Sequence, residues 1–295
     1  MIRVGTAGWS YPDWEGVVYP KGTAASRDAL ALLVRMFDTL EINVTFYRPP
    51  SSRMSQSWAT RVAARPTFRF TAKLWRGFTH ERGEVHAAEE RLFKEGMKPL
   101  VEAGRLGALL AQFPHSFKDN PENRGYLDNL IDRFAAYPLV VELRHLSWME
   151  GDLLSTLDGR GVGFCNVDQP LFSTSAHPST VMTGSVGYVR LHGRNKAEWF
   201  RKDAGRDSRY DYLYSHEEIR EWADRIRLMQ RKPKGGADLF IIANNHYRGQ
   251  APANALELMN LLSGEMIEVP ESLTRAFPHL APIAAKPQRP GMLPL

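Results

Sequence analysis

Short apolar runs alternate with helical patterns along nearly the whole chain. Eight runs rich in apolar or β-branched residues predict strands. Most are continuously apolar, which is typical of parallel strands covered on both faces. The strands are expected at 2–6, 39–46, 67–73, 107–112, 138–143, 161–166, 187–192 and 238–243.

Between these runs, apolar residues recur at the three- and four-residue spacing of an amphipathic helix. Asn120 followed by Pro121 marks one helix start, and Ser215 with Glu218 predicts a capping box at another. Pro99 should kink its helix or end it early. Further helices are expected over 51–64, 85–103 and 250–263.

Strands that alternate with helices predict one α/β domain, a single (β/α)8 barrel of the TIM type. The alternative is a doubly wound open sheet, but no glycine-rich phosphate-binding motif follows a strand. Two segments depart from the pattern: a long polar loop at 193–214 and a proline-rich stretch near the C-terminus. We therefore predict a barrel domain over 1–268 and a tail over 269–295.

Composition agrees with a globular protein and narrows its setting. The chain has 295 residues, 43% of them hydrophobic, and no apolar run long enough to cross a membrane. Its one cysteine, Cys165, excludes an internal disulfide framework and indicates a cytoplasmic location. The first residues form a strand pattern rather than a secretion signal. A net charge of +5 is compatible with solubility alone or with an anionic partner.

In such a barrel the active site lies at the C-terminal ends of the strands. Glu41, Glu142 and Arg190 stand out there, because the runs around them are apolar and buried ions must be paired. A structural Glu–Arg network would account for each one singly, whereas the whole polar rim favours a binding site. We expect one pocket to collect Trp9, Lys73, Glu142, Arg144, Asp168, Arg190, His192, Asn245 and His246.

Seven sequence motifs occur in a fixed order between about residues 1 and 265. They are GTAGWSYPDWEGVVYP, EINVTFYRPP, FRFTAKLWRGFTH, GALLAQFPHSF, VVELRHLSW, GYVRLHGR and ANNHYRGQAPANA. Together they resemble the domain-of-unknown-function-72 family, also called YecE-like. The resemblance implies a TIM-type barrel with a shared pocket near FRFTAK and the FTH that follows it, the ELRH–SW segment and NNH. It implies no reaction, because the family has no established biochemical function.

The first functional hypothesis is a protein that binds or acts on a phosphorylated or polyhydroxylated small molecule. Arginines suit its anionic group, amides suit hydroxyl groups, and aromatic rings can stack on a sugar. The substrate-binding candidates are Trp9, Asn43, Tyr47, Arg48, Gln112, Arg144, His145, Trp148, Arg190, Arg194, Asn244, Asn245 and His246.

Four residues are candidates for catalysis. Glu142 could act as acid or base with His192 or Asp168. Lys73 could form a Schiff base, although an ion pair with Glu41 or Glu142 is the stronger interpretation. Such an enzyme would be a hydrolase, a lyase or an isomerase on sugar or phosphate-ester substrates. The sequence leaves open whether the protein is an enzyme at all.

Two other functions remain open. One is a metal-dependent phosphodiesterase related to apurinic endonucleases, with ligands from Glu41, Glu142, His145, Asp168, His192 and His246. No HxH, HExxH or DxD pair supports it, so no cofactor or metal site is assigned. The other is a non-catalytic barrel that binds nucleic acid through the basic and aromatic loop 193–214, although no nucleic-acid motif is present.

Two further expectations concern single features. Cys165 lies in the apolar run GVGFCNV and should be a buried core residue rather than a nucleophile. The loop 193–214 should form a lid, because it starts on the predicted rim and is longer than a usual connection. An ordered decoration on the side of the barrel is the alternative. The aromatic residues expected to cover a ligand are Trp199, Phe200, Tyr210, Tyr212 and Tyr214.

Overall fold

Eight parallel strands close into a barrel, in sequence order, with β8 hydrogen-bonded to β1. The computed structural model describes the chain except for residues 22–24, 83–86, 202–206, 232–236 and 286–295. The strands are β1 Ile2–Ala7, β2 Thr39–Ile42, β3 Arg69–Lys73, β4 Leu106–Gln112, β5 Leu139–Glu142, β6 Gly163–Asp168, β7 Val186–Leu191 and β8 Asp238–Ala243. The predicted (β/α)8 TIM-type barrel is confirmed.

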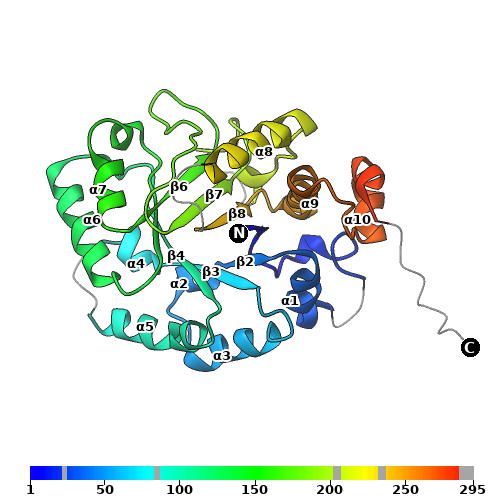
Figure 1. Cartoon of the computed structure of the whole chain (residues 1–295), viewed down its shortest axis with the longest axis horizontal. Coiled ribbons are helices and arrows are strands. Elements are labelled where there is room, and N and C mark those ends of the chain that lie inside the picture. Colours follow the sequence, from blue (N-terminus) through cyan, green and yellow to red (C-terminus); the bar gives the residue numbers. More distant parts are fainter. Residues whose placement is uncertain (22–24, 83–86, 202–206, 232–236, 286–295) are drawn as a thin grey trace, which may run out of the picture.

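Helices surround the strands, with α3 and α5 on one side of the barrel and α8 on the opposite side (Figure 1). The longer helices are α1 Ala25–Met36, α3 Ser52–Arg61, α5 Ala87–Glu102, α6 Pro121–Arg133, α7 Leu153–Gly159, α8 His216–Gln230 and α9 Gln250–Ser263. The short ones are α2 Val44–Tyr47, α4 Arg76–Thr79, α10 Glu271–Ala276, and the 3-10 turns Pro12–Trp14, Leu146–Met149, Ser208–Tyr210, Tyr247–Gly249 and Pro278–Ile283.

Local signals fix several helix ends. The Asn120 side chain accepts a hydrogen bond from the Asn123 amide, and Ser215 and Glu218 form the predicted capping box. The helix around Pro99 does not end there: α5 continues to Glu102. Its buried face includes residues on both sides of the proline, so packing against the barrel outweighs the one backbone hydrogen bond that proline removes.

The second strand is shorter than predicted and ends at Ile42. The chain then turns into α2, where the Thr45 hydroxyl lies within hydrogen-bond distance of the carbonyl oxygens of Ile42 and Lys73, at 3.0 and 2.7 Å. This turn joins the ends of β2 and β3. It brings Asn43 and Tyr47 to the mouth of the barrel.

Side chains at alternate strand positions point into the barrel. A buried cluster made only of strand residues, separate from the core between strands and helices, marks these positions. Its members are Ala7, Ala108, Leu110, Val140, Cys165, Val167, Val186, Tyr188, Phe240 and Ile242. Cys165 is fully buried, as predicted, and burial raises the pKa of its thiol well above the usual value.

The segment after 268 contains α10 and the turn Pro278–Ile283. Leu273 and Leu280, one from each, are fully buried against the rest of the chain. Ile267 and Ala284 also pair through their backbones. The part of the predicted tail at 286–295 lies outside the described residues. In the ranges that the structure describes, no helix is both long enough and apolar enough to cross a membrane.

Candidate functional site

A charged network is buried in the barrel just below its C-terminal mouth. Arg190 donates to Glu41 and to Glu142, at 2.8 Å in each case. Arg144 donates to the other Glu142 oxygen at 2.7 Å through Nε. The Tyr188 hydroxyl donates to Glu41 at 2.9 Å. Two carboxylates are thus balanced by two guanidinium groups, which is the structural alternative that the sequence offered for these residues.

This pairing fixes the protonation states in the network. Burial alone would raise the pKa of Glu142, but Arg144 and Arg190 outweigh it and hold that pKa well below its usual range. Burial and the same two arginines lower the pKa of His192 to about 3, so its ring is neutral. Asn244 lies 2.9 Å from His192 Nδ1, and Glu142 lies 3.3 Å from Nε2. The tautomer that satisfies both contacts carries its proton on Nε2.

The next inward position on several strands forms the floor of a cavity. Asn43, Lys73, Gln112, Arg144 and Asn244 each lie two residues beyond a buried interior position and line a cavity of about 910 Å³. Since inward side chains recur every second residue, strand alternation places all five at the mouth of the barrel.

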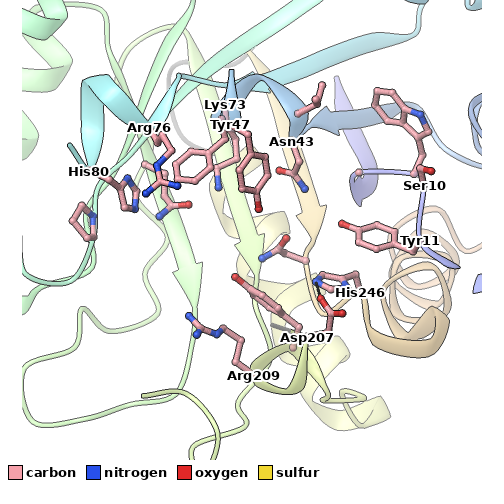
Figure 2. Close-up of a pocket in the computed structure, with 18 of the residues that line it drawn as sticks. Ser10, Tyr11, Asn43, Tyr47, Lys73, Arg76, His80, Asp207, Arg209 and His246 are labelled. Atoms are coloured by element: carbon pink, nitrogen blue, oxygen red, sulfur yellow. Dashed lines mark ion pairs between the residues drawn. The ribbon is translucent and has the colours of Figure 1, made fainter. Parts of the chain in front are cut away.

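Figure 2 shows how the walls of this cavity face one another. Lys73, Tyr47 and Asn43 lie on one side, and Arg209 and Asp207 lie on the other. The remaining wall includes aromatic and basic side chains that the sequence analysis did not single out. These are Tyr11, Phe46, Trp58, Arg76, His80 and His115.

The cavity is electropositive. Lys73, Arg76, Arg144 and Arg209 line it, while Asp207 supplies the one carboxylate among the described lining residues. Arg76 and Arg144 are paired with acids outside the lining, Glu81 and Glu142. In the described part of the chain, the Arg209 and Lys73 side chains have no carboxylate within ion-pair distance.

Lys73 is the last residue of β3, and its side chain is only partly buried. Its Nζ lies 4.3 Å from the centre of the Phe46 ring. Burial, and then the positive charge of Arg190, lower the pKa of Lys73 to about 7. The expected ion pair with Glu41 or Glu142 is absent among the described residues, because Arg190, Arg144 and Tyr188 occupy those carboxylates.

A stack of rings forms another wall. The Tyr11 ring lies on His246, with centroids 4.5 Å apart, and Tyr210 contacts the same histidine at 4.8 Å. The Tyr11 hydroxyl donates to the Ala7 carbonyl at 2.6 Å. Burial raises the pKa of Tyr11 far above its usual value, so its hydroxyl stays protonated.

Eight of the predicted site residues line the cavity: Trp9, Asn43, Tyr47, Lys73, Gln112, Arg144, Asn244 and His246. Nine lie outside its lining: Arg48, Glu142, His145, Trp148, Asp168, Arg190, His192, Arg194 and Asn245. Of the nine residues expected to converge on one pocket, Trp9, Lys73, Arg144 and His246 line the cavity. The other five, Glu142, Asp168, Arg190, His192 and Asn245, are not part of its lining.

Asp168 illustrates why strand ends alone misplace a residue. Its neighbour Val167 belongs to the barrel interior, so Asp168 points outward toward α8. There it accepts hydrogen bonds from Trp222 at 2.6 Å, Tyr214 at 3.0 Å and Arg194 at 2.7 Å. Asn245 likewise faces outward and donates to Asn254 of α9 at 2.9 Å.

Three further candidates, Arg48, Trp148 and His145, also lie outside the cavity lining. Arg48 is exposed outside the cavity. Trp148 is buried, and its indole nitrogen donates to the Phe117 carbonyl at 2.7 Å. The His145 side chain accepts from the Ser147 amide at 3.1 Å and caps the turn that follows. Neither of these two side chains is part of the cavity lining.

The residues considered as metal ligands do not assemble into a site. Within the described ranges, no group of three or more His, Cys, Asp or Glu side chains is placed to hold an ion. Glu41 and Glu142 instead bind Arg190, and Asp168 lies on the outer face of β6. The phosphodiesterase hypothesis therefore gains no support from the arrangement of its proposed ligands.

The long loop after β7 contributes one wall of the cavity. Trp199, Phe200 and Tyr210 line it, together with Asp207 and Arg209. Tyr214 does not: it is buried beside Asp168, and its hydroxyl accepts from the Gly193 amide at 2.8 Å. Residues 202–206 of the predicted lid lie outside the described residues. The loop is thus placed over the site, whereas its opening and closing stay a prediction.

The chain is similar in sequence to known proteins. The family model described as "Protein of unknown function DUF72" matches residues 3–278. The UPF0759 protein YunF of Bacillus subtilis (strain 168) is 30% identical over 279 residues, which is 90% of this chain and 96% of that protein.

Two crystal structures of DUF72 family proteins share the fold. The protein from Thermotoga maritima MSB8 has a TM-score of 0.77 at 34% identity, over 89% of this chain and 99% of that one. The protein from Enterococcus faecalis V583 has a TM-score of 0.76 at 28% identity, over 89% of this chain and 95% of that one.

Proposed function

The chain belongs to the DUF72 family of proteins of unknown function, and from this premise we propose that its barrel mouth binds a small molecule bearing an anionic group and several hydroxyl groups, as a sugar phosphate does. The observation that carries the proposal is the charge of the cavity, which has four Lys and Arg side chains and one carboxylate in its described lining. A volume of about 910 Å³ also suits a small molecule.

Arg209 is the best-placed partner for the anionic group. It lines the cavity, is half-buried, and has no carboxylate within ion-pair distance in the described part of the chain. A guanidinium group can donate two parallel hydrogen bonds to a phosphate, and such charge-assisted bonds are strong. Arg144 is held in place by Glu142 and presents a second cation to the same space.

The amide groups on the floor suit hydroxyl groups. Gln112 is 8% exposed at the end of β4, and among the described residues its side chain has no hydrogen-bond partner. Asn43 and Asn244 line the same cavity. The rings of Trp9 and Tyr47 provide apolar faces for stacking. Glu142, His192 and Asp168 lie outside the cavity, so we do not propose them as its acid and base.

Calorimetric titration tests the proposal with three matched probes: ribose 5-phosphate, ribose and inorganic phosphate. Ribose 5-phosphate should bind more tightly than either fragment, because it engages the cations and the amides together. A single-stranded oligonucleotide is included because loop 193–214 also mixes basic and aromatic residues. The proposal fails if the oligonucleotide binds at the mouth and none of the small probes does.

Two variants locate the binding. Arg209→Gln should weaken the binding of ribose 5-phosphate by about 10- to 100-fold, because a charged hydrogen bond is lost. Gln112→Met should weaken the same binding by about 5- to 10-fold, because a neutral hydrogen bond is lost. Arg220→Gln removes the same charge from an exposed position on α8 and should leave affinity unchanged. Equal losses in Arg209→Gln and Arg220→Gln would show that overall charge, not the cavity, attracts the phosphate.

A further inference from the structure

Lys73 lines the cavity, and its Nζ lies over the ring of Phe46. It stands at the end of β3, where this strand pairs with β4 through Lys73 and Leu110. Its backbone carbonyl also accepts a hydrogen bond from the Thr45 hydroxyl at 2.7 Å. The base of the side chain is therefore fixed, while Nζ faces the cavity shown in Figure 2.

Among the described residues, no carboxylate lies within ion-pair distance of the Lys73 ammonium group. Glu41 gives one oxygen to Arg190 and the other to Tyr188, at 2.8 and 2.9 Å. Glu142 gives its two oxygens to Arg144 and Arg190, at 2.7 and 2.8 Å. Both acids are thus satisfied by other donors, and the Lys73 amine is bounded by the Phe46 ring and the open cavity.

These surroundings disfavour the charged form of the amine. The groups packed around Nζ replace part of its water, and Arg190 adds a nearby positive charge, so the pKa of Lys73 falls to about 7. An ordinary lysine is almost entirely protonated near neutral pH and is a poor nucleophile. At Lys73 a large fraction of the amine carries a free electron pair under the same conditions.

We propose that Lys73 is a nucleophile that forms an imine with the carbonyl group of an open-chain sugar phosphate bound in the cavity. The inference rests on the proposed function and narrows its ligand class to phosphorylated aldehydes or ketones. Phe46 keeps water from one side of the amine. Arg209 lies on the opposite wall of the cavity (Figure 2), so a phosphate bound there leaves the space beside the amine to the carbonyl group.

The step balances without any other reactant. The Nζ electron pair attacks the carbonyl carbon, and the carbonyl π pair moves to oxygen to give a carbinolamine. The two amine protons leave with that oxygen as water, and a C=N bond replaces the C=O bond. Protonation of the imine nitrogen then draws electrons from the adjacent carbon. This is the activation that lyases and isomerases with a catalytic lysine employ.

Reductive trapping tests the imine. The protein is incubated with ribose 5-phosphate and sodium cyanoborohydride near pH 7, digested, and analysed by mass spectrometry. The hydride of the reductant adds to the C=N carbon and makes the adduct permanent. One reduced adduct on Lys73 is expected, well ahead of any other lysine. Lys98→Arg, at an exposed site on α5, is the control and should leave the adduct unchanged.

Lys73→Arg keeps a cation but removes the nucleophile, so it should abolish the adduct while ribose 5-phosphate still binds by calorimetry. Ribitol 5-phosphate has the same phosphate and hydroxyl groups without a carbonyl, and it should bind and suppress trapping. Tight binding of ribitol 5-phosphate with no adduct from ribose 5-phosphate would overturn the imine and leave the proposed function intact.

A small aldehyde separates the reactivity of the amine from phosphate recognition. Formaldehyde with cyanoborohydride near pH 7 should methylate Lys73 at least about 10-fold faster than Lys98, because the fraction of neutral amine sets the rate. Equal rates would overturn the inference whether or not sugar phosphates bind. Faster labelling of Lys73 without any binding of ribose 5-phosphate would instead contradict the proposed function.

Discussion

At the residue scale, one buried side chain holds the barrel interior together. Arg190 is 1% exposed and donates to two carboxylates, Glu41 and Glu142, that are themselves fully buried. Taking ions out of water costs several kcal/mol each, and only close pairing offsets that cost. The network is therefore stable as a unit and intolerant of losing its central member.

Arg190→Met should lower the free energy of unfolding by about 3–5 kcal/mol, because two buried carboxylates lose their shared partner. Urea denaturation followed by circular dichroism measures the change. The matched control is Arg35→Met, which breaks an exposed pair with Glu268 and should cost less than about 1 kcal/mol. Similar losses in both variants would show that the interior network is no more important than a surface ion pair.

The Lys73 amine should leave a signature in the pH dependence of stability. Its pKa is lowered from 10.5 to about 7 in the folded protein, so between these pH values the unfolded chain binds more protons. The free energy of unfolding should therefore rise with pH in this window. Relative to Lys73→Met, the wild type should gain about 2 kcal/mol from pH 7 to 9. Parallel stability curves for the two proteins would contradict a lowered pKa.

Side-chain direction explains which site residues the sequence could supply. Lys73, Gln112 and Arg144 were identified because each ends or follows a strand, and each also lies on the inward face. Asp168 and Asn245 satisfy the first condition but not the second. The alternation of β6, in which Cys165 and Val167 point inward, was already readable in the sequence. The positions of the aromatic rings on the loops could not be predicted in this way, because loop residues do not alternate between two faces as strand residues do.

At the element scale, the loop 193–214 joins the proposed site to the rest of the chain. It starts after β7 on the rim and supplies Trp199, Phe200 and Tyr210 to the cavity wall. Its second half returns to the barrel side through Tyr214 and the Ser215 cap of α8. The segment thus contains both a wall over the site and a decoration on the barrel, which the sequence presented as alternatives.

Limited proteolysis with trypsin tests whether the loop moves as a lid. In the free protein, cleavage should occur near 201–209, and saturating ribose 5-phosphate should slow it by about 10-fold if the loop closes over the ligand. Cleavage after an exposed arginine elsewhere, such as Arg53 on α3, should stay constant and serves as the internal control. An unchanged rate at the loop, with ligand bound by calorimetry, would rule out a lid.

Element boundaries were less predictable than the elements themselves. Strand β2 ends at Ile42, where the chain turns into α2. The turn is held by the Thr45 hydroxyl, which contacts the Lys73 carbonyl of the neighbouring β3, and local sequence does not reveal such a contact. Helix α5 passes through Pro99 because packing on both sides of it outweighs the lost backbone bond. The short helix α10 and the turn Pro278–Ile283 were read as proline-rich tail, although Leu273 and Leu280 anchor them.

At the scale of the whole molecule, the barrel was predictable because its signal repeats eight times. Each apolar run and helical pattern supports the same closed architecture, and the seven ordered motifs add the family. The ligand was not predictable in that way, because it depends on how single side chains from many elements meet at one end. Closure of the barrel brings Tyr11, Lys73 and Arg209 together across more than a hundred residues of sequence.

The most direct test of the account is a crystal structure of the protein with ribose 5-phosphate. We predict electron density for one ligand molecule at the barrel mouth, with its phosphate within hydrogen-bond distance of Arg209 or Arg144 and its carbonyl carbon beside Lys73. The same density should be lost in crystals of Arg209→Gln. Ligand bound elsewhere on the molecule, or an empty mouth at a concentration that saturates the protein in solution, would contradict the account.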